Sequence, residues 1–288
     1  PLGTGPPPLV ERRPPIVPSR PLSYTAIAAY EECPYRFYME RVLGLPGSGR
    51  TSARIAEGNT TSTGGDDGSP SAREERSARG AAVHALLEWS QANAWEEPSA
   101  ELAGRHGVAA GLDAEATDSE SLLEPVRDWL GSPLLRDEVD GAVRIRAEVP
   151  ILLGVGETVL RGSIDLLVER EGGPPLVVDY KTDRLGSADP RERAEKYEIQ
   201  RSIYALAAAQ ALGADAVEVA YVFLERAEQP VLTTLGPAEM DAGRERLSAA
   251  IDRIGAGEFP VAPESERSWD LCRGCPALGR LCSGPESD

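Results

Sequence analysis

The sequence predicts an α/β protein with a small mixed central β-sheet flanked by helices. Two stretches, 143–153 and 157–168, alternate as strands do, and a short buried strand at 176–180 follows a Gly-Gly-Pro turn. Another strand is predicted at 217–224, beyond a long helical stretch. The order of helices, three strands, helix, strand and helix suits one sheet with helices packed against it. The three consecutive strands are close enough in the chain to form a meander.

The region before the first of these strands contains a linker, helices and a loop. Residues 1–21 are rich in proline and lack apolar periodicity, so we expect a linker or the remnant of a cleaved tag. Ser23 is placed to cap a helix that extends, with a break near Cys33, to Val42. The segment 46–77 is rich in Gly, Ser, Thr and charged residues, which predicts a mobile loop.

The remaining helices are predicted from apolar residues at helical spacing. One covers about 78–93, and further helical pieces extend to about residue 135. Two more cover 191–212 and 237–254. We therefore expect one folded domain over residues 22–288.

Composition restricts the class of protein. The 288 residues are 41% hydrophobic with a net charge of −17, and neither an apolar run of membrane-spanning length nor a charged-then-apolar leader is present. Four cysteines are few for a secreted disulfide scaffold, so we expect a reduced, cytoplasmic protein without a membrane partner. The acidity opposes tight DNA binding, because phosphate contacts need Lys and Arg. A site that holds cations on carboxylates is itself acidic, however, and the first fifty residues are basic.

Ionisable side chains occur inside two of the apolar strands. Asp179 and Lys181 are two residues apart, so both point to the same side of their strand. If the strand that contains Asp165 runs antiparallel beside it, the two carboxylates can converge. Two carboxylates, a backbone carbonyl (Tyr180 is the candidate) and water suit Mg²⁺ or Mn²⁺. The plain alternative is an Asp–Lys ion pair at a strand edge.

These residues carry a resemblance to a known family. The segments Gly-Ser-Ile-Asp at 162–165 and Asp-Tyr-Lys-Thr at 179–182 resemble the PD-(D/E)xK nuclease motif in its RecB-like form. The sequence has Ile164 where the superfamily's name puts proline. The resemblance implies a restriction-endonuclease-like core in which Asp165 and Asp179 hold the metal and Lys181 is the catalytic lysine.

Two flanking helices extend the resemblance. His84, in Arg-Gly-Ala-Ala-Val-His, resembles the histidine of the family's Gly-x-x-x-His helix, which is a further metal ligand. Gln200 and Tyr204 resemble the family's Q-x-x-x-Y helix beside the active centre, and residues four apart share a helix face. Taken singly, these are equally a core histidine and an ordinary helix edge. Glu148 lies where such nucleases often have an acid, and we expect it to support a ligand.

The cysteines form a second candidate site. Cys272, Cys275 and Cys282 lie close together near the end of the chain, and Cys33 is far upstream. Four thiolates suit a [4Fe–4S] cluster or a structural zinc, and their spacing does not decide between these. The pattern resembles the iron–sulfur site of AddB-like nucleases, which implies a [4Fe–4S] cluster that joins the two ends of the domain. Reduced cysteines without a metal are the alternative.

The resemblance covers most of residues 22–288 and implies a function. It indicates a metal-dependent DNA nuclease in repair or recombination that acts on single strands or unwound ends. It also implies a UvrD-type helicase motor as partner, for which residues 6–21 would be the tether. The alternative is a non-catalytic iron–sulfur module that holds DNA ends; an intact set of His84, Asp165, Asp179 and Lys181 argues against it.

Overall fold

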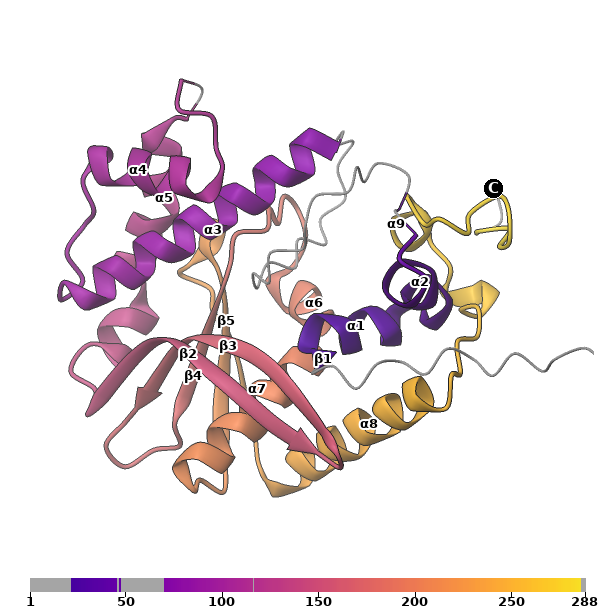
Figure 1. Cartoon of the computed structure of the whole chain (residues 1–288). Helices are drawn as coiled ribbons and strands as arrows, with labels where there is room; N and C mark the ends of the chain where they lie inside the picture. Colours follow the sequence, from indigo (N-terminus) through magenta and orange to yellow (C-terminus); the bar gives the residue numbers. More distant parts are fainter. Residues whose placement is uncertain (1–21, 46, 48–69, 116, 286–288) are drawn as a thin grey trace, which may run out of the picture.

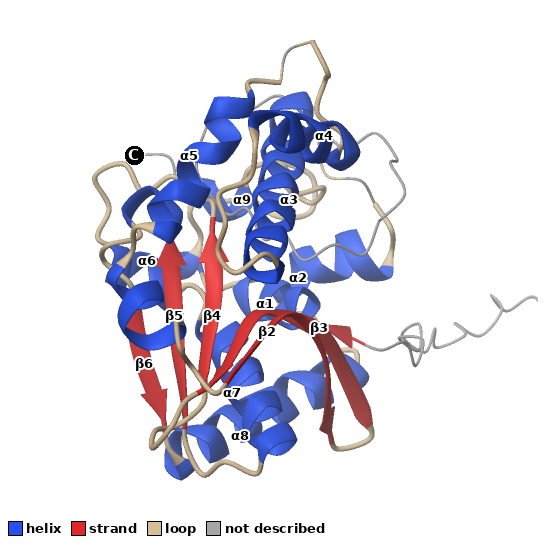
Figure 2. Ribbon diagram, turned by 90° about the vertical axis from the view of Figure 1, so that its left-hand side faces the viewer, coloured by secondary structure: helices blue, strands red, loops and turns tan. Residues whose placement is uncertain are grey.

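The computed structural model describes residues 22–45, 47, 70–115 and 117–285 and contains a mixed β-sheet with helices on both faces (Figures 1 and 2). The predicted linker at 1–21 and most of the predicted loop at 46–77 lie outside the described residues. No helix in the described part is long and apolar enough to cross a membrane. The predicted α/β class with a small mixed central sheet is confirmed.

The N-terminal segment forms a short strand and consecutive helical turns. Oγ of Ser23 accepts a hydrogen bond from the backbone N–H of Ala26, which caps the first helix as predicted. Cys33 has an extended backbone and separates this helix from the next. The elements are β1 (Leu22–Ser23), α1 (Tyr24–Glu32), α2 (Pro34–Phe37) and a π-helical turn (Tyr38–Val42).

Three helices follow and cover one face of the sheet. They are α3 (Pro70–Ala92), α4 (Ala100–Ala110) and α5 (Ser119–Leu130), followed by a π-helical turn (Leu135–Val139). Helix α3 begins at Pro70 and not near residue 78, so the end of the predicted loop is helical. Charged residues such as Glu74 and Arg76 suggested a loop, but Glu and Arg are also good helix formers.

The sheet has the strand order β1-β3-β4-β5-β6, with β2 paired to the other edge of β3. Strands β2, β3 and β4 form the predicted antiparallel meander, and β4 and β5 are parallel. The short strands β1 and β6 were not predicted, because neither is long enough to show a clear period. The strands after β1 are β2 (Arg144–Val155), β3 (Thr158–Glu169), β4 (Leu176–Lys181), β5 (Val217–Phe223) and β6 (Val231–Leu235).

The predicted helix at 191–212 is two helices. Residues Lys196 and Tyr197 separate α6 (Pro190–Glu195) from α7 (Glu198–Leu212). The break arises from tertiary contacts, since Tyr221 of β5 donates a hydrogen bond to the backbone carbonyl of Tyr197. The chain continues through the long helix α8 (Pro237–Gly255), the short helix α9 (Trp269–Cys272) and two 3₁₀ turns, Leu224–Arg226 and Glu264–Glu266.

Two hydrophobic cores lie on opposite faces of the sheet. One contains residues of α1, α7 and α8, and the other contains residues of α3, α4 and α5 (Figure 2). Strand β3 changes sides between them: Leu160 and Ile164 belong to the first core, whereas Leu166 and Val168 belong to the second. The regular alternation of side chains between the two faces of β3 is therefore interrupted at Asp165.

The edge of β3 opposite β2 is shared by two short ladders. Strand β1 pairs with residues 160–161, and β4 pairs with residues 166–168. Residues 162–165, which include Asp165, lie on the edge between these ladders.

Candidate active site

Asp165 lies where strands β3 and β4 separate. The β3–β4 ladder ends at the pair Leu166–Val178, and beyond it the carboxylate of Asp165 accepts a hydrogen bond of 2.8 Å from the backbone N–H of Tyr180. The side chain is only 3% exposed. Oδ2 of Asp165 is thus fixed by the backbone of β4, and Oδ1 is left to interact with His84.

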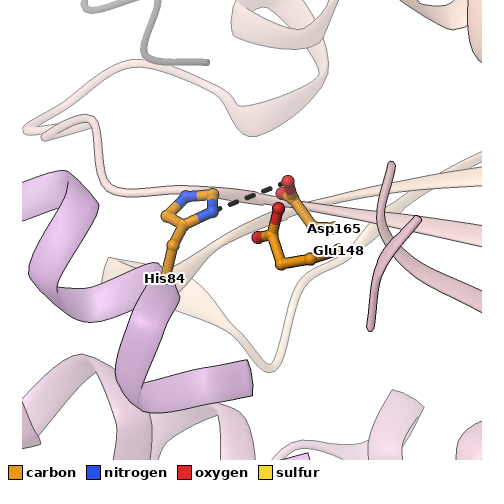
Figure 3. Close-up of side chains that lie close together, drawn as sticks. All are labelled: His84, Glu148 and Asp165. Atoms are coloured by element: carbon orange, nitrogen blue, oxygen red, sulfur yellow. Dashed lines mark ion pairs between the residues drawn. The ribbon is translucent and has the colours of Figure 1, made fainter. Parts of the chain in front are cut away.

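His84, Glu148 and Asp165 converge from α3, β2 and β3 (Figure 3). Each offers a ligand atom, and these three atoms all lie within 4.8 Å of one another. Nδ1 of His84 is 3.6 Å from Oδ1 of Asp165. One nitrogen and two carboxylate donors form a ligand set that suits Mg²⁺ or Mn²⁺, so the residues fit a divalent cation.

Glu148 reaches this group through an unusual backbone conformation. Its φ of 47° is in the left-handed region, which residues with a Cβ adopt only at a cost. Ser163 donates a hydrogen bond of 3.1 Å to the Glu148 carboxylate. The sequence suggested Glu148 only as a support for a ligand, but the structure places it beside Asp165 and His84.

A signal for this placement exists in the sequence. Strands β2 and β3 are joined through the tight turn at Gly156 and Glu157, so their register follows by counting back from the turn. Counting places Glu148 opposite Asp165. Counting residues from the turn predicts neither the left-handed backbone of Glu148 nor the change of face of the two strands.

A second group of buried polar side chains surrounds Lys181. Its Nζ lies 2.6 Å from Oδ2 of Asp179, without hydrogen-bond geometry, and donates to Oε1 of Gln200 at 2.9 Å. The amide nitrogen of Gln200 donates to Asp179 at 3.0 Å and to the hydroxyl of Tyr204 at 2.8 Å. Asp179, Lys181, Gln200 and Tyr204 are therefore one hydrogen-bonded unit on β4 and α7.

Asp179 and Tyr180 are related differently to the cluster of three. Asp179 interacts electrostatically with His84 and Asp165, but it is not part of the group whose ligand atoms all lie within 4.8 Å. The Tyr180 side chain faces the second core, where the centroid of its ring lies 6.1 Å from that of the His84 ring. Metal ligation by Asp179 and by the Tyr180 carbonyl stays a prediction.

Burial and neighbouring charges shift the pKa values in the site. Burial raises the pKa of Asp179 to about 6, although Lys181 opposes the shift. Burial lowers the pKa of His84, but the charge and hydrogen bond of Asp165, together with the charges of Asp179 and Glu148, outweigh burial and raise this pKa to about 9. Burial and the Asp165 charge also raise the pKa of Glu148. Acids gathered this closely need a cation, whether a proton or a metal.

The four cysteines line one pocket between α2 and the C-terminal segment. Sγ of Cys33 accepts a hydrogen bond from the backbone N–H of Arg36, whose guanidinium in turn donates to the carbonyl of Leu271. Burial raises the pKa of Cys272, and the other three cysteines raise it further. All four lie in the described part of the chain, and no three of their sulfurs are all within 4.8 Å of one another.

Comparisons with known proteins give a family and a shared fold. The model of the PD-(D/E)XK nuclease superfamily matches residues 21–282. A crystal structure from Eubacterium rectale, of a protein described as a "putative exonuclease", is 12% identical with a TM-score of 0.51 and covers 93% of this chain and 91% of that one. The structure of SSO0001 is 15% identical and covers 79% and 85%, but its TM-score of 0.29 is too low to bear on the fold. A comparison with curated proteins found no match.

Proposed function

The chain belongs to the PD-(D/E)XK nuclease superfamily, and we propose on this premise that it is a metal-dependent deoxyribonuclease that hydrolyses phosphodiester bonds. The observation that carries the proposal is one continuous site, in which His84, Glu148 and Asp165 adjoin the buried Asp179–Lys181–Gln200 unit. An isolated ion pair at a strand edge would need neither the histidine nor the left-handed glutamate.

The residues divide into two roles. His84, Glu148 and Asp165 would hold a divalent cation, with Asp179 as a further ligand. When bound, such a cation neutralises phosphate charge and lowers the pKa of water. Lys181 would orient the attacking water and offset negative charge that develops on phosphorus. Gln200 fixes the Lys181 and Asp179 side chains relative to each other through two hydrogen bonds.

DNA ends are the proposed substrate, as single strands or unwound duplex, in DNA repair or recombination. The RecB-like form of the motif at 162–165 and 179–182 supports this choice. The net charge of −17 predicts weak DNA binding without a partner. A UvrD-type helicase motor is the proposed partner, and a cytoplasmic location agrees with four unpaired cysteines.

We propose further that Cys33, Cys272, Cys275 and Cys282 hold a [4Fe–4S] cluster. The support is that all four line one pocket although Cys33 is remote in sequence. Four thiolates also suit a structural zinc, and the choice of iron–sulfur over zinc rests on the resemblance of the cysteine pattern to that of AddB-like nucleases.

Cleavage of labelled DNA tests the nuclease proposal directly. The purified protein is incubated with end-labelled single- and double-stranded oligonucleotides, with Mg²⁺, Mn²⁺ or a chelator. We expect metal-dependent cutting that falls at least about a hundredfold in Lys181→Met. The matched control is Lys196→Met, since the sequence contains two lysines and Lys196 is exposed. Binding of DNA without cutting, with either metal, would instead indicate the non-catalytic end-binding module.

A further inference from the structure

Lys181 is enclosed on more sides than its two polar partners account for. The residue is 7% exposed, and Asp179 and Gln200 contact its ammonium group from the polar side. Nζ also lies 4.0 Å from the centroid of the Tyr197 ring and 5.4 Å from that of Tyr221. The ammonium therefore rests between a carboxylate, an amide and two aromatic faces.

Tyr197 occupies the break between α6 and α7. Its φ of −104° and ψ of 17° lie near the sparsely populated bridge region, in which many active-site residues occur. Tyr197 precedes Gln200 by three residues, so the start of α7 provides two of the groups that contact Lys181.

Three contacts fix the Tyr197 ring and backbone. Its hydroxyl donates a hydrogen bond to the carboxylate of Asp183, two residues beyond Lys181. Its carbonyl accepts hydrogen bonds from the Tyr221 hydroxyl at 2.8 Å and from the backbone N–H of Arg201 at 2.9 Å. The Tyr197 side chain is thus tied to the segment that follows β4, and its backbone is tied to β5 and α7.

An aromatic face suits a buried lysine for a physical reason. The ammonium group is strongly hydrated and sits on a flexible four-carbon stem, so it tends to leave a dry site for water. A ring face attracts the cation most strongly where water is excluded, and it adds no oxygen that would compete with a phosphate. Donation from the phenol to a carboxylate polarises the ring further and strengthens this attraction.

We propose that Tyr197 is a positioning residue: its ring, fixed by Asp183, holds the ammonium of Lys181 at the reaction site and keeps water from it. The inference rests on the proposed function in giving Lys181 a catalytic role. Tyr197 itself touches Lys181 and not the reacting atoms. Lys196, the only other lysine of the sequence, is exposed and offers a built-in reference.

The test compares Tyr197→Leu, which removes the ring, with Tyr197→Phe and Asp183→Ala, which keep the ring and remove the hydrogen bond between the hydroxyl and the carboxylate. Full-length protein is pulsed with acetic anhydride, and acetylation of Lys181 relative to Lys196 is measured by mass spectrometry. The same proteins are assayed for kcat and KM on labelled DNA. We expect Tyr197→Leu to raise relative acetylation, and to lower kcat, by about tenfold with little change in KM. The other two variants should match each other and lie between Tyr197→Leu and the wild type.

Unchanged acetylation of Lys181 in Tyr197→Leu would overturn the proposal, because the ring would then not cover the ammonium. A difference between Tyr197→Phe and Asp183→Ala would overturn the role given to the hydrogen bond that these two residues share. If no variant and no wild-type protein cuts DNA, the proposed function fails, while the acetylation ratio still decides whether the ring holds Lys181.

Discussion

Glu148 of β2 faces Asp165 of β3 across the strand pair, between the partners Ala147–Leu166 and Val149–Ile164. At this point both strands pass from one hydrophobic core to the other: Ala147 packs against the second core and Val149 against the first. The left-handed backbone of Glu148 accommodates the change of face. The irregularity thus brings two carboxylates together on the same side of the strand pair.

Replacing Glu148 should separate backbone strain from metal binding. Glu148→Ala and Glu148→Gly both remove the carboxylate, so each should weaken Mn²⁺ binding by a similar factor. Glu148→Gly should be more stable than Glu148→Ala by about 1 kcal/mol, because only glycine adopts a positive φ without a steric penalty. Urea unfolding and Mn²⁺ titration check both parts. Equal stability of the two variants would mean that residue 148 leaves the left-handed conformation once the glutamate is replaced.

The buried Asp179–Lys181 pair should be costly to break from one side. Lys181→Met leaves Asp179 without its cation, and loss of one partner of a buried pair costs about 3–5 kcal/mol. Adding Asp179→Asn should recover part of this stability, although neither variant cuts DNA. Urea unfolding of the single and double variants measures the recovery. A double variant less stable than Lys181→Met would exclude a strong coupling between the two charges.

The cost of Lys181→Met should also rise with pH. The pKa of Asp179 is raised to about 6 in the folded wild type, and it should rise further once Lys181 is gone. When the pKa of a carboxyl group is higher in the folded than in the unfolded state, the protein loses stability as pH rises from the unfolded-state value through the folded-state value. The deficit of Lys181→Met relative to wild type should therefore be larger at pH 8 than at pH 5, in metal-free buffer. A deficit that shrinks with pH would contradict this assignment.

Metal binding should release a proton from His84. The pKa of His84 is raised to about 9 without a metal, and a ligand must be neutral to bind one. Mn²⁺ affinity should therefore rise between pH 7 and pH 9, by up to about tenfold per pH unit. Titration calorimetry in buffers of different ionisation enthalpy measures the release. The rise of Mn²⁺ affinity with pH should be smaller in His84→Gln and unchanged in the control His106→Gln. An equal pH dependence in both variants would mean that His84 is a structural residue and not a metal ligand.

Loss of Cys33 should loosen the C-terminal segment more than the N-terminal helices. Cys33→Ser should remove iron and expose the segment around α9 to protease. Residues near α2 should stay protected, because Phe259 stacks on Phe37 at 6.1 Å and on Tyr38 at 4.9 Å. Iron analysis and limited proteolysis with mass spectrometry check this. Full iron content with equal protection would exclude Cys33 as a ligand, and stoichiometric zinc in colourless protein would exclude the iron–sulfur cluster.

Local patterns predicted most of the sheet and part of the site. The meander of β2, β3 and β4 follows from apolar runs separated by glycine turns, and the common side of Asp179 and Lys181 follows from the period of two. Helical spacing likewise predicted that Gln200 and Tyr204 share a face, and a hydrogen bond joins them.

Features that depend on contacts between distant segments were not predictable. The α6–α7 break at Tyr197 depends on Tyr221 and Asp183, which no helical propensity records. The face change at Glu148 depends on how two cores divide one strand pair. Strand β6, with only five residues, gave too short a pattern to distinguish from a loop.

Asp179 belongs both to the side chains that would hold a metal and to those that fix the lysine, but the helices that contribute to these two groups lie on opposite faces of the sheet. His84 comes from α3 on one face, whereas Gln200 and Tyr197 come from the start of α7 on the other. A substitution in the core beneath α3 should therefore alter affinity for the cation, and one beneath α7 should alter turnover. An engineer who wishes to adjust one of these properties therefore has a set of side chains to vary on the corresponding face, with Asp179 left unchanged because it serves both.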